Sequence, residues 1–305
     1  MIDDTQIQKQ GFLQVSDKHK IYYKTLGNPN GIPLLCFHGG PGGTFKAKYA
    51  ALADKNKYYT ILFNQRGCGC SIPSGELNDN TPDTAIADAK KLLNLLNIKE
   101  CYLMGFSYGS TLAMLFAMHN PTMVKSMFLS SVFVPDNFDD RFYGDSAKKK
   151  NPISYNRFIS AVGCKNSADL LRAIDTVTRE QKESIIQALI NWEIELFTGC
   201  DSVTYTSPEK IDDILISSKR ILLNYAANNY FGLREKILGN LSKIEHIPIT
   251  IIHGDCDYLT PISTAYELQK SLPQIKIVPV VGGGHVGSRV SGVLYDEINR
   301  YTTEL

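Results

Sequence analysis

Two kinds of hydrophobic pattern alternate along the chain. Short apolar runs, such as residues 32–37 and 58–63, are typical of β-strands buried on both faces. Longer stretches, such as residues 81–96, have the apolar periodicity of amphipathic helices. Their alternation predicts βαβ units and a mostly parallel sheet with helices on both faces, which is an α/β architecture. The expected strands span residues 11–16, 20–26, 32–37, 58–63, 101–104, 124–130, 247–252 and 275–281, and the expected helices among them span 81–96, 111–118, 262–271 and 287–301.

The middle of the chain has a different pattern. Residues 137–230 contain no convincing buried strand and carry the periodicity of amphipathic helices instead. The alternation of strands and helices resumes near residue 247. The clearest helices expected in this middle region span residues 167–177, 180–197 and 207–225.

This change of pattern predicts an insertion in a single sheet. We expect a core domain formed by residues 1–134 and 236–305, interrupted by a helical cap domain at residues 135–235. An insertion at this point is expected to lie above the carboxyl ends of the strands, where ligands bind in open α/β sheets.

The composition narrows the class of protein and partner. The 305 residues are 43% hydrophobic and 21% charged, which is typical of a globular protein with a large core. The formal net charge of +1 gives no reason to expect a nucleic-acid partner. No apolar run approaches the ~18 residues of a membrane span, and the polar start lacks the pattern of a secretory signal. The seven cysteines are expected to be free thiols, with no pair at zinc or redox spacing, so we expect a cytoplasmic protein without metal or organic cofactor.

A G-x-S-x-G motif follows the apolar run at 101–104 and precedes a helical pattern. Its members are Gly105, Ser107 and Gly109. Between a strand and a helix this motif is typical of a nucleophile elbow, in which the serine projects from a sharp turn. The alternative is a plain glycine-serine turn that only ends the strand. The other loops of the chain decide between the two.

The candidate base is His285, which ends the glycine-rich segment 280–285 after the last expected strand. A neutral imidazole titrates near pH ~6.5 and can accept a proton from serine at neutral pH. His38 and His253 also follow strands, and we expect them to bond loop backbone instead.

Two carboxylates compete for the role of orienting His285. Asp255 and Asp257 both follow the expected strand 247–252. An acid at this place can hold the imidazole tautomer and stabilise imidazolium. The H-G-x-x-D pattern common in hydrolases of this order favours Asp257, with Asp255 as the alternative.

The candidate oxyanion hole lies in the loop at residues 38–43, whose sequence is H-G-G-P-G-G. The backbone N–H of Gly40 and that of Tyr108, directly after the candidate nucleophile, can face a developing oxyanion. A phosphate-binding loop is the alternative, but the G-K-[ST] ending is missing. The chain order Ser107, Asp257, His285 is that of the α/β-hydrolase fold.

With these motifs the sequence resembles the proline iminopeptidase (prolyl aminopeptidase) family of α/β-hydrolases over most of its length. The resemblance rests on residues 38–43, on N-Q-R-G-C-G-C-S at 64–71, on G-F-S-Y-G-S at 105–110, and on Trp192-Glu193 in the middle region. It implies a helical cap, a Ser-His-Asp triad, and release of an N-terminal residue, typically proline, from small peptides. It also implies that Glu193 binds the substrate amine, with Trp192, Gly39 and Tyr230 as further substrate-binding residues.

The sequence departs from the family pattern at three positions. Ala227 stands where the family commonly has a second glutamate, and Asn64 and Cys70 stand where it has aspartate and arginine. The loss at Ala227 lowers the electrostatic demand for a free amine, with Glu195 as a cap acid that could replace it. The alternative function is therefore an esterase or amidase that needs no free amine, and a non-catalytic ligand-binding homologue is the third possibility. Dehalogenase and epoxide-hydrolase chemistry are disfavoured, since those α/β-hydrolases use a carboxylate at the position of Ser107.

Overall fold

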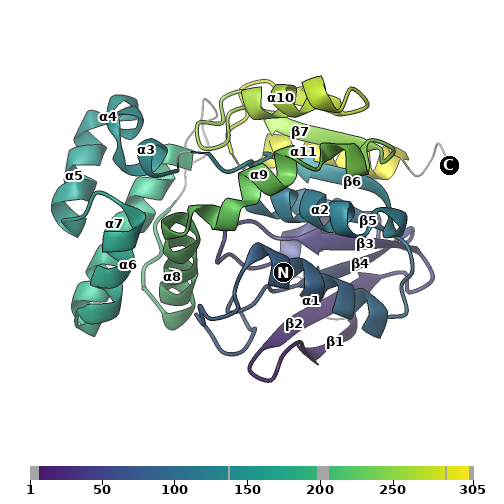
Figure 1. The fold of residues 1–305 in the computed structure, drawn as a ribbon, viewed down its shortest axis with the longest axis horizontal. Helices are drawn as coiled ribbons and strands as arrows, with labels where there is room; N and C mark the ends of the chain where they lie inside the picture. Colours follow the sequence, from purple (N-terminus) through teal and green to yellow (C-terminus); the bar gives the residue numbers. More distant parts are fainter. Residues whose placement is uncertain (1–6, 137, 198–205, 286, 302–305) are drawn as a thin grey trace.

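The computed structural model describes residues 7–136, 138–197, 206–285 and 287–301. Its centre is an eight-stranded sheet with the order β1-β2-β4-β3-β5-β6-β7-β8 (Figure 1). β2 is antiparallel to both of its neighbours, and all other adjacent pairs are parallel. The predicted α/β class, with a mostly parallel sheet, is confirmed. The strands are β1 (Ile7–Gln14), β2 (Lys20–Gly27), β3 (Ile32–Phe37), β4 (Tyr58–Phe63), β5 (Cys101–Phe106), β6 (Val124–Ser130), β7 (Ile249–Gly254) and β8 (Lys276–Val280).

Helices cover both faces of the sheet. The side chains along a strand point alternately toward the helices on one face and the helices on the other. In β3, Leu35 and Phe37 face one hydrophobic cluster, whereas Leu34 and Cys36 face the other. The strands read as continuous apolar runs because both of their faces are buried in this way. The first face is covered by α1 (Pro82–Leu95), α2 (Tyr108–His119), α9 (Leu233–Leu238) and α10 (Ser263–Ser271), and the second by η2 (Ala47–Leu52) and α11 (Ser288–Tyr301).

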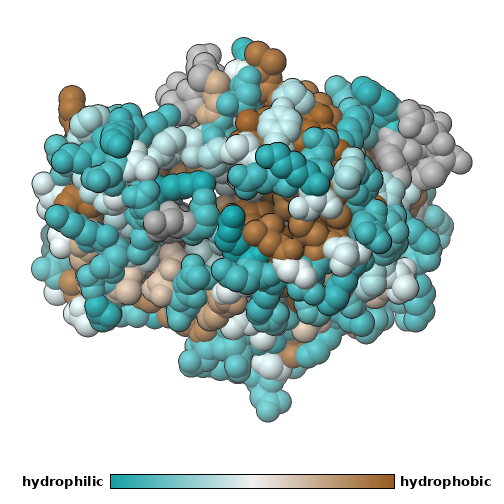
Figure 2. Space-filling model, turned by 45° about the horizontal axis from the view of Figure 1, so that its top comes forward, coloured by the Kyte–Doolittle hydropathy of each residue, from teal (hydrophilic) through white to brown (hydrophobic). Residues whose placement is uncertain are grey.

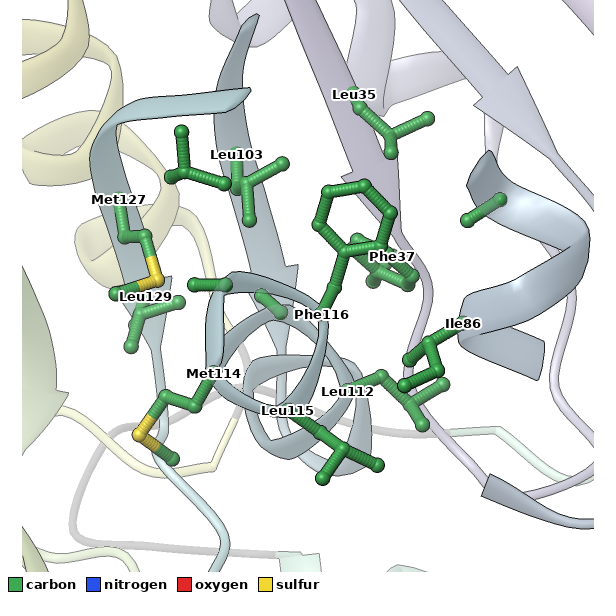
Figure 3. Close-up of a cluster of buried hydrophobic side chains, with 14 of the residues drawn as sticks. Leu35, Phe37, Ile86, Leu103, Leu112, Met114, Leu115, Phe116, Met127 and Leu129 are labelled. Atoms are coloured by element: carbon green, nitrogen blue, oxygen red, sulfur yellow. The ribbon is translucent and has the colours of Figure 1, made fainter. Parts of the chain in front are cut away.

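Helix α2 lies against the middle of the sheet. Figure 3 shows Phe116 of α2 beside Phe37 of β3, and the two ring centroids are 5.9 Å apart. Leu103 of β5 and Leu129 of β6 face the same helix. Nearly all of α2 is buried. The end of β5 and the start of α2 are therefore held firmly, and the G-x-S-x-G motif lies between them.

The ends of the elements follow local sequence signals in some places and tertiary contacts in others. α1 begins as expected, with Thr81 as N-cap in a capping box and Pro82 at the first position. β1 begins at Ile7, before the expected residue 11, because its polar residues pair with β2 at the edge of the sheet. α8 (Asp213–Ala227) begins six residues later than expected, where Asp212 caps it.

A separate group of helices lies between β6 and β7 in the chain. These helices (Figure 1, left) enclose a hydrophobic cluster that includes Trp192. The division into a core and a cap at residues 134/135 and 235/236 stays a prediction. The helices of this group are α3 (Phe138–Tyr143), α4 (Asp145–Lys150), α5 (Pro152–Val162), α6 (Ser167–Thr176), α7 (Arg179–Phe197) and α8, and short 3₁₀ helices elsewhere are η3 (Pro121–Met123), η4 (Asn229–Gly232) and η5 (Leu241–Ile244).

An area of hydrophobic side chains near the middle of one face is bordered by hydrophilic ones (Figure 2). Among the residues that the structure describes, no helix combines the length and the apolar character needed to cross a membrane.

The expectation of free thiols is wrong at Cys256, which is disulfide-bonded. Free thiols are found at Cys36, Cys68, Cys70, Cys101 and Cys164.

Candidate active site

Three candidate side chains meet at the carboxyl edge of the parallel strands. Ser107 follows β5, Asp257 follows β7 and His285 follows β8. In a parallel sheet the loops after the strands share one edge, so residues far apart in sequence lie side by side. The structure brings these three side chains into one hydrogen-bonded series.

Ser107 lies in the sharp turn between β5 and α2, with φ 52° and ψ −124°. This conformation is unusual for a residue with a side chain. The turn needs glycine on both sides: a Cβ at Gly105 would lie 2.7 Å from the carbonyl oxygen of Gly109, and a Cβ at Gly109 would lie 2.1 Å from that of Phe37. The motif therefore forms an elbow, as its sequence predicts.

His285 joins the other two side chains. Its Nε2 lies 3.0 Å from Ser107 Oγ, and its Nδ1 lies 2.8 Å from Asp257 Oδ2. Because the carboxylate can only accept, the proton on Nδ1 belongs to the bond with Asp257, and Nε2 is left to accept from the serine hydroxyl. The Ser131 hydroxyl donates to the backbone carbonyl of His285 at 2.7 Å and fixes its loop.

Asp257 is held as a carboxylate by its surroundings. It accepts from the Thr260 hydroxyl at 2.6 Å and from the Thr260 N–H at 2.9 Å. Burial by itself would raise the pKa of Asp257. The attraction to His285 and the hydrogen bonds from His253, His285 and Thr260 outweigh burial and hold the pKa well below its usual range. A charged Asp257 can orient imidazole and stabilise imidazolium.

Asp255, the alternative acid, lies elsewhere. Its side chain is exposed and accepts from the backbone N–H of Gly282 at 2.8 Å. The geometry therefore favours Asp257 as the partner of His285.

The glycine-rich loop after β3 passes close to the elbow. A Cβ at Gly39 would lie 3.0 Å from the carbonyl oxygen of Phe106 and 3.4 Å from the Cβ of Ser107. Gly40 has a φ of 135°, which favours glycine. Tyr108 is the first residue of α2, so its N–H has no acceptor within the helix. Both groups predicted for an oxyanion hole therefore belong to segments that adjoin Ser107.

Two further histidines bond loop backbone, as expected. His38 Nδ1 lies 2.8 Å from the carbonyl oxygen of Gly39, and its Nε2 accepts from the Gln65 N–H at 3.1 Å. His253 Nε2 donates to the carbonyl oxygen of Thr260 at 2.5 Å. Burial lowers the pKa of His38 to about 4, although its bond to Gly39 opposes this effect.

The lowered pKa of His38 predicts a pH-dependent stability. The folded group titrates near pH 4 and the unfolded group near pH ~6.5. As pH falls between these values the unfolded chain binds a proton that the folded chain does not, so the free energy of unfolding decreases. We expect this one group to account for a loss on the order of 2 kcal/mol between pH 7.5 and pH 5.

Urea unfolding at the two pH values measures this loss. His38→Asn should show a smaller loss than the wild type, and the exposed His246→Asn serves as the matched control. The same loss in wild type and His38→Asn would contradict the assignment.

Asn64, one of the departures from the family pattern, supports the loop that follows β3. Its buried amide oxygen accepts from the Thr44 hydroxyl at 2.7 Å and from the Phe45 N–H at 3.1 Å. Cys70 is exposed. Neutral hydrogen bonds from Thr44 and Phe45 to Asn64 therefore support the loop after β3.

Helix α7 meets the site at its last residue. The ring of Phe197 stacks on His285, with centroids 5.5 Å apart and an interplanar angle of 12°. Glu193 lies four residues earlier, so it shares a helix face with Phe197 one turn away. α7 thus brings Glu193 to the side of the site where the imidazole lies.

Glu193 is buried on α7 and carries an ion pair. Only 6% of the residue is exposed, and its Oε2 accepts from Lys219 Nζ of α8. Tyr230 is also buried, and its ring packs edge-on against Phe133 with centroids 5.2 Å apart. Burial is the main cause of the raised pKa of Tyr230, and nearby negative charges that include Glu193 add to it.

Trp192 packs against α3 and α5. It is 1% exposed, and its indole N–H donates to the carbonyl oxygen of Phe142 at 3.0 Å. Its ring stacks on Phe158 with centroids 5.7 Å apart. These contacts give Trp192 a packing role in the hydrophobic cluster of the helices between β6 and β7, and the prediction that it binds substrate gains no support from them.

Neither Ala227 nor Glu195 supplies a second carboxylate next to Glu193. Ala227 is the exposed last residue of α8. Glu195 lies two residues after Glu193 and therefore on another face of α7. Its carboxylate accepts from the side chain of Asn151, the N-cap of α5, at 3.1 Å.

Three contributors to the site were not expected from the sequence. Thr260 follows Asp257 by three residues, and this D-x-x-T spacing is a local signal for the turn that it closes. Phe197 and Lys219 have no such signal, because their contacts depend on how α7 and α8 lie over the sheet. Among the described residues, no group of three or more His, Cys, Asp or Glu could hold a metal ion.

The arrangement is suited to acyl transfer. It has a hydroxyl beside an imidazole, a carboxylate behind the imidazole, and backbone N–H groups next to the hydroxyl. Groups in these relative positions can activate a nucleophile and stabilise an oxyanion.

Comparison with known proteins identifies a matching family, relatives by sequence and solved structures with a similar fold. The sequence model of the alpha/beta hydrolase fold matches residues 32–288. A proline iminopeptidase of Xylella fastidiosa (strain Temecula1 / ATCC 700964) is 31% identical over 283 residues, covering 90% of each chain. A probable proline iminopeptidase of Leptolyngbya boryana is 30% identical over 304 residues, covering 97% of this chain and 95% of the other. The crystal structure of MGS-M2, an alpha/beta hydrolase enzyme from a Medee basin deep-sea metagenome library, has a TM-score of 0.63 at 19% identity, covering 97% of this chain and 98% of the other.

Proposed function

The chain belongs to the proline iminopeptidase family of α/β-hydrolases, and on this premise we propose that it is a serine hydrolase that releases an N-terminal residue, typically proline, from small peptides. The observation that carries the proposal is the hydrogen-bonded series at 3.0 Å from Ser107 Oγ to His285 Nε2 and 2.8 Å from His285 Nδ1 to Asp257 Oδ2. A series of this kind activates a serine hydroxyl.

In the first half of the proposed reaction, Ser107 Oγ attacks the carbonyl carbon of the scissile bond. His285 Nε2 takes the hydroxyl proton, and Asp257 stabilises the imidazolium that forms. The oxyanion accepts hydrogen bonds from the N–H groups of Gly40 and Tyr108. When the intermediate collapses, His285 donates its proton to the leaving amine, and an acyl-enzyme remains on Ser107.

In the second half, water replaces the leaving amine. His285 takes a proton from the water, whose oxygen attacks the acyl carbonyl. The same N–H groups hold the second oxyanion, and Ser107 recovers its proton as the acid leaves. In this proposal Glu193 holds the substrate amine during both halves, while Gly39 and Tyr230 line the substrate site.

A second candidate function is an esterase or amidase that needs no free amine. Two observations favour it. Ala227 provides no second carboxylate for an amine, and Glu193 is already paired with Lys219. The machinery at Ser107 would be the same for both functions, and only the recognition of the substrate would differ.

The test compares three substrates: proline-β-naphthylamide, its N-acetyl form, and p-nitrophenyl acetate. For the aminopeptidase we expect hydrolysis of the free prolyl compound and at least about a tenfold lower kcat/KM for the acetylated one. Equal turnover of the free and acetylated compounds would contradict the aminopeptidase and support the second candidate. Failure of all three substrates, together with no labelling of Ser107 by a fluorophosphonate, would contradict the serine hydrolase.

A further inference from the structure

The cap places one of its own cations on the carboxylate that is proposed to bind the substrate amine. Lys219 Nζ of α8 pairs with Glu193 Oε2 of α7. The side chains are 13% and 8% exposed, respectively, so water screens the pair only weakly. The geometry is therefore that of a buried ion pair between two cap helices.

Both helices that carry this pair also contact the machinery around Ser107. One turn after Glu193, Phe197 stacks on His285 at 5.5 Å between ring centroids. The neighbour of Lys219, Ser218, lies against the glycine-rich loop, where a Cβ at Gly42 would be 2.1 Å from the Ser218 carbonyl oxygen. The pair thus lies between one helix that contacts the base and one that contacts the loop proposed to form the oxyanion hole.

The pair changes the charge that a substrate would meet. A buried carboxylate without a partner strongly favours binding of an ammonium group, because its own charge is otherwise uncompensated. In this chain Lys219 already neutralises Glu193, and Ala227 contributes no charge. The two charged side chains sum to zero before any substrate binds.

We propose that Lys219 is a specificity-determining residue whose ammonium group competes with the substrate amine for Glu193. This inference rests on the proposed hydrolase function and deepens it by naming what sets the discrimination between free and blocked amines. A free amine that pairs with Glu193 must either displace Lys219, which leaves a mostly buried lysine without its partner, or share the carboxylate with it, which places two cations side by side. A substrate with an acylated amine, or an ester without any amine, avoids this cost.

Replacing the lysine tests the competition. In Lys219→Met we expect the ratio of kcat/KM for proline-β-naphthylamide over its N-acetyl form to rise about tenfold or more above the wild-type ratio. Lys219→Arg keeps the positive charge and should keep the wild-type ratio. The matched control is Lys236→Met, which removes a lysine of similar pairing, with Asp83, from a more exposed pair on α9.

A double variant protects the test against loss of folding. Lys219→Met leaves Glu193 without a partner in a buried place, which could destabilise the cap. Lys219→Met/Glu193→Gln removes both charges, so it should fold even where the single variant does not. It should also fall below Lys219→Met in its preference for the free amine. Circular dichroism and turnover of p-nitrophenyl acetate monitor folding in each variant.

Binding measured without turnover separates this inference from the hydrolase proposal. In a Ser107→Ala background, calorimetry gives the ratio of the dissociation constants of the two prolyl compounds, with and without Lys219→Met. A ratio that shifts toward the free amine supports the competition even if the wild type hydrolyses neither compound. An unchanged ratio in the folded Lys219→Met variant, or no binding of either compound, would overturn it. Failure of the hydrolase proposal would show itself separately, as absence of both turnover and fluorophosphonate labelling in the wild type.

Discussion

Ser107→Ala is expected to lower kcat for proline-β-naphthylamide or p-nitrophenyl acetate by about 10⁴- to 10⁶-fold, the range found for removal of an activated serine. The variant keeps His285 and Asp257 in place but has no oxygen 3.0 Å from the imidazole Nε2 to attack the carbonyl. Steady-state kinetics with a purified variant, together with fluorophosphonate labelling, measures the loss.

The exposed Ser146 of α4 provides the matched control. Ser146→Ala removes a hydroxyl that donates to the carboxylate of Asp140, away from the site, and should leave kcat unchanged within about twofold. A Ser107→Ala variant that keeps more than about a hundredth of the wild-type kcat, or that is still labelled, would show that another group is the nucleophile.

Asp257→Asn is expected to lower kcat by about 10⁴-fold, as for the corresponding change in a known serine triad. The asparagine must accept from both Thr260 and the Nδ1–H of His285, which the present carboxylate does with Oδ1 at 2.9 Å and Oδ2 at 2.6 and 2.8 Å. An amide offers only one accepting oxygen, so its nitrogen must face a donor. The imidazole is then driven toward the tautomer with its proton on Nε2, which cannot accept from Ser107.

Asp255→Asn is the matched control for this change. It changes another aspartate, two residues earlier in the chain. Asp255 is exposed, and an amide oxygen at this position can still accept from the backbone N–H of Gly282. Its kcat should stay within about threefold of the wild type. The opposite result, with a severe loss in Asp255→Asn and a mild one in Asp257→Asn, would reverse the assignment of the acid.

Local signals in the sequence were sufficient to predict the sheet and the elbow. The apolar runs became strands because burial on both faces requires them, and Gly105 and Gly109 flank a turn that admits no side chain beside it. The start of α1 was also predictable, since its cap and first-position proline act within a few residues. The meeting of Ser107, Asp257 and His285 was also predictable, because each residue follows a parallel strand and these strands end at the same edge of the sheet.

Contacts of α7 and α8 with each other and with the loops at the edge of the sheet were not predictable in this way. The stack of Phe197 on His285 and the pair of Glu193 with Lys219 depend on the relative placement of α7, α8 and the sheet. The adjacency of Trp192 and Glu193 suggested a shared role, yet neighbours on a helix point in different directions. Trp192 packs in the hydrophobic cluster of the helices between β6 and β7, while Glu193 pairs with Lys219 of α8.

The backbone of Ser107 implies a trade-off between stability and activity. A residue with a side chain at φ 52° and ψ −124° costs the folded state roughly 1–3 kcal/mol, a cost that glycine would avoid. A chain selected for resistance to unfolding alone would therefore carry glycine at this position. By keeping serine the protein gives up a sizeable part of a typical folding free energy of about 5–15 kcal/mol at a single residue. Attempts to raise its melting temperature should accordingly leave residues 105–109 untouched and look for stability elsewhere.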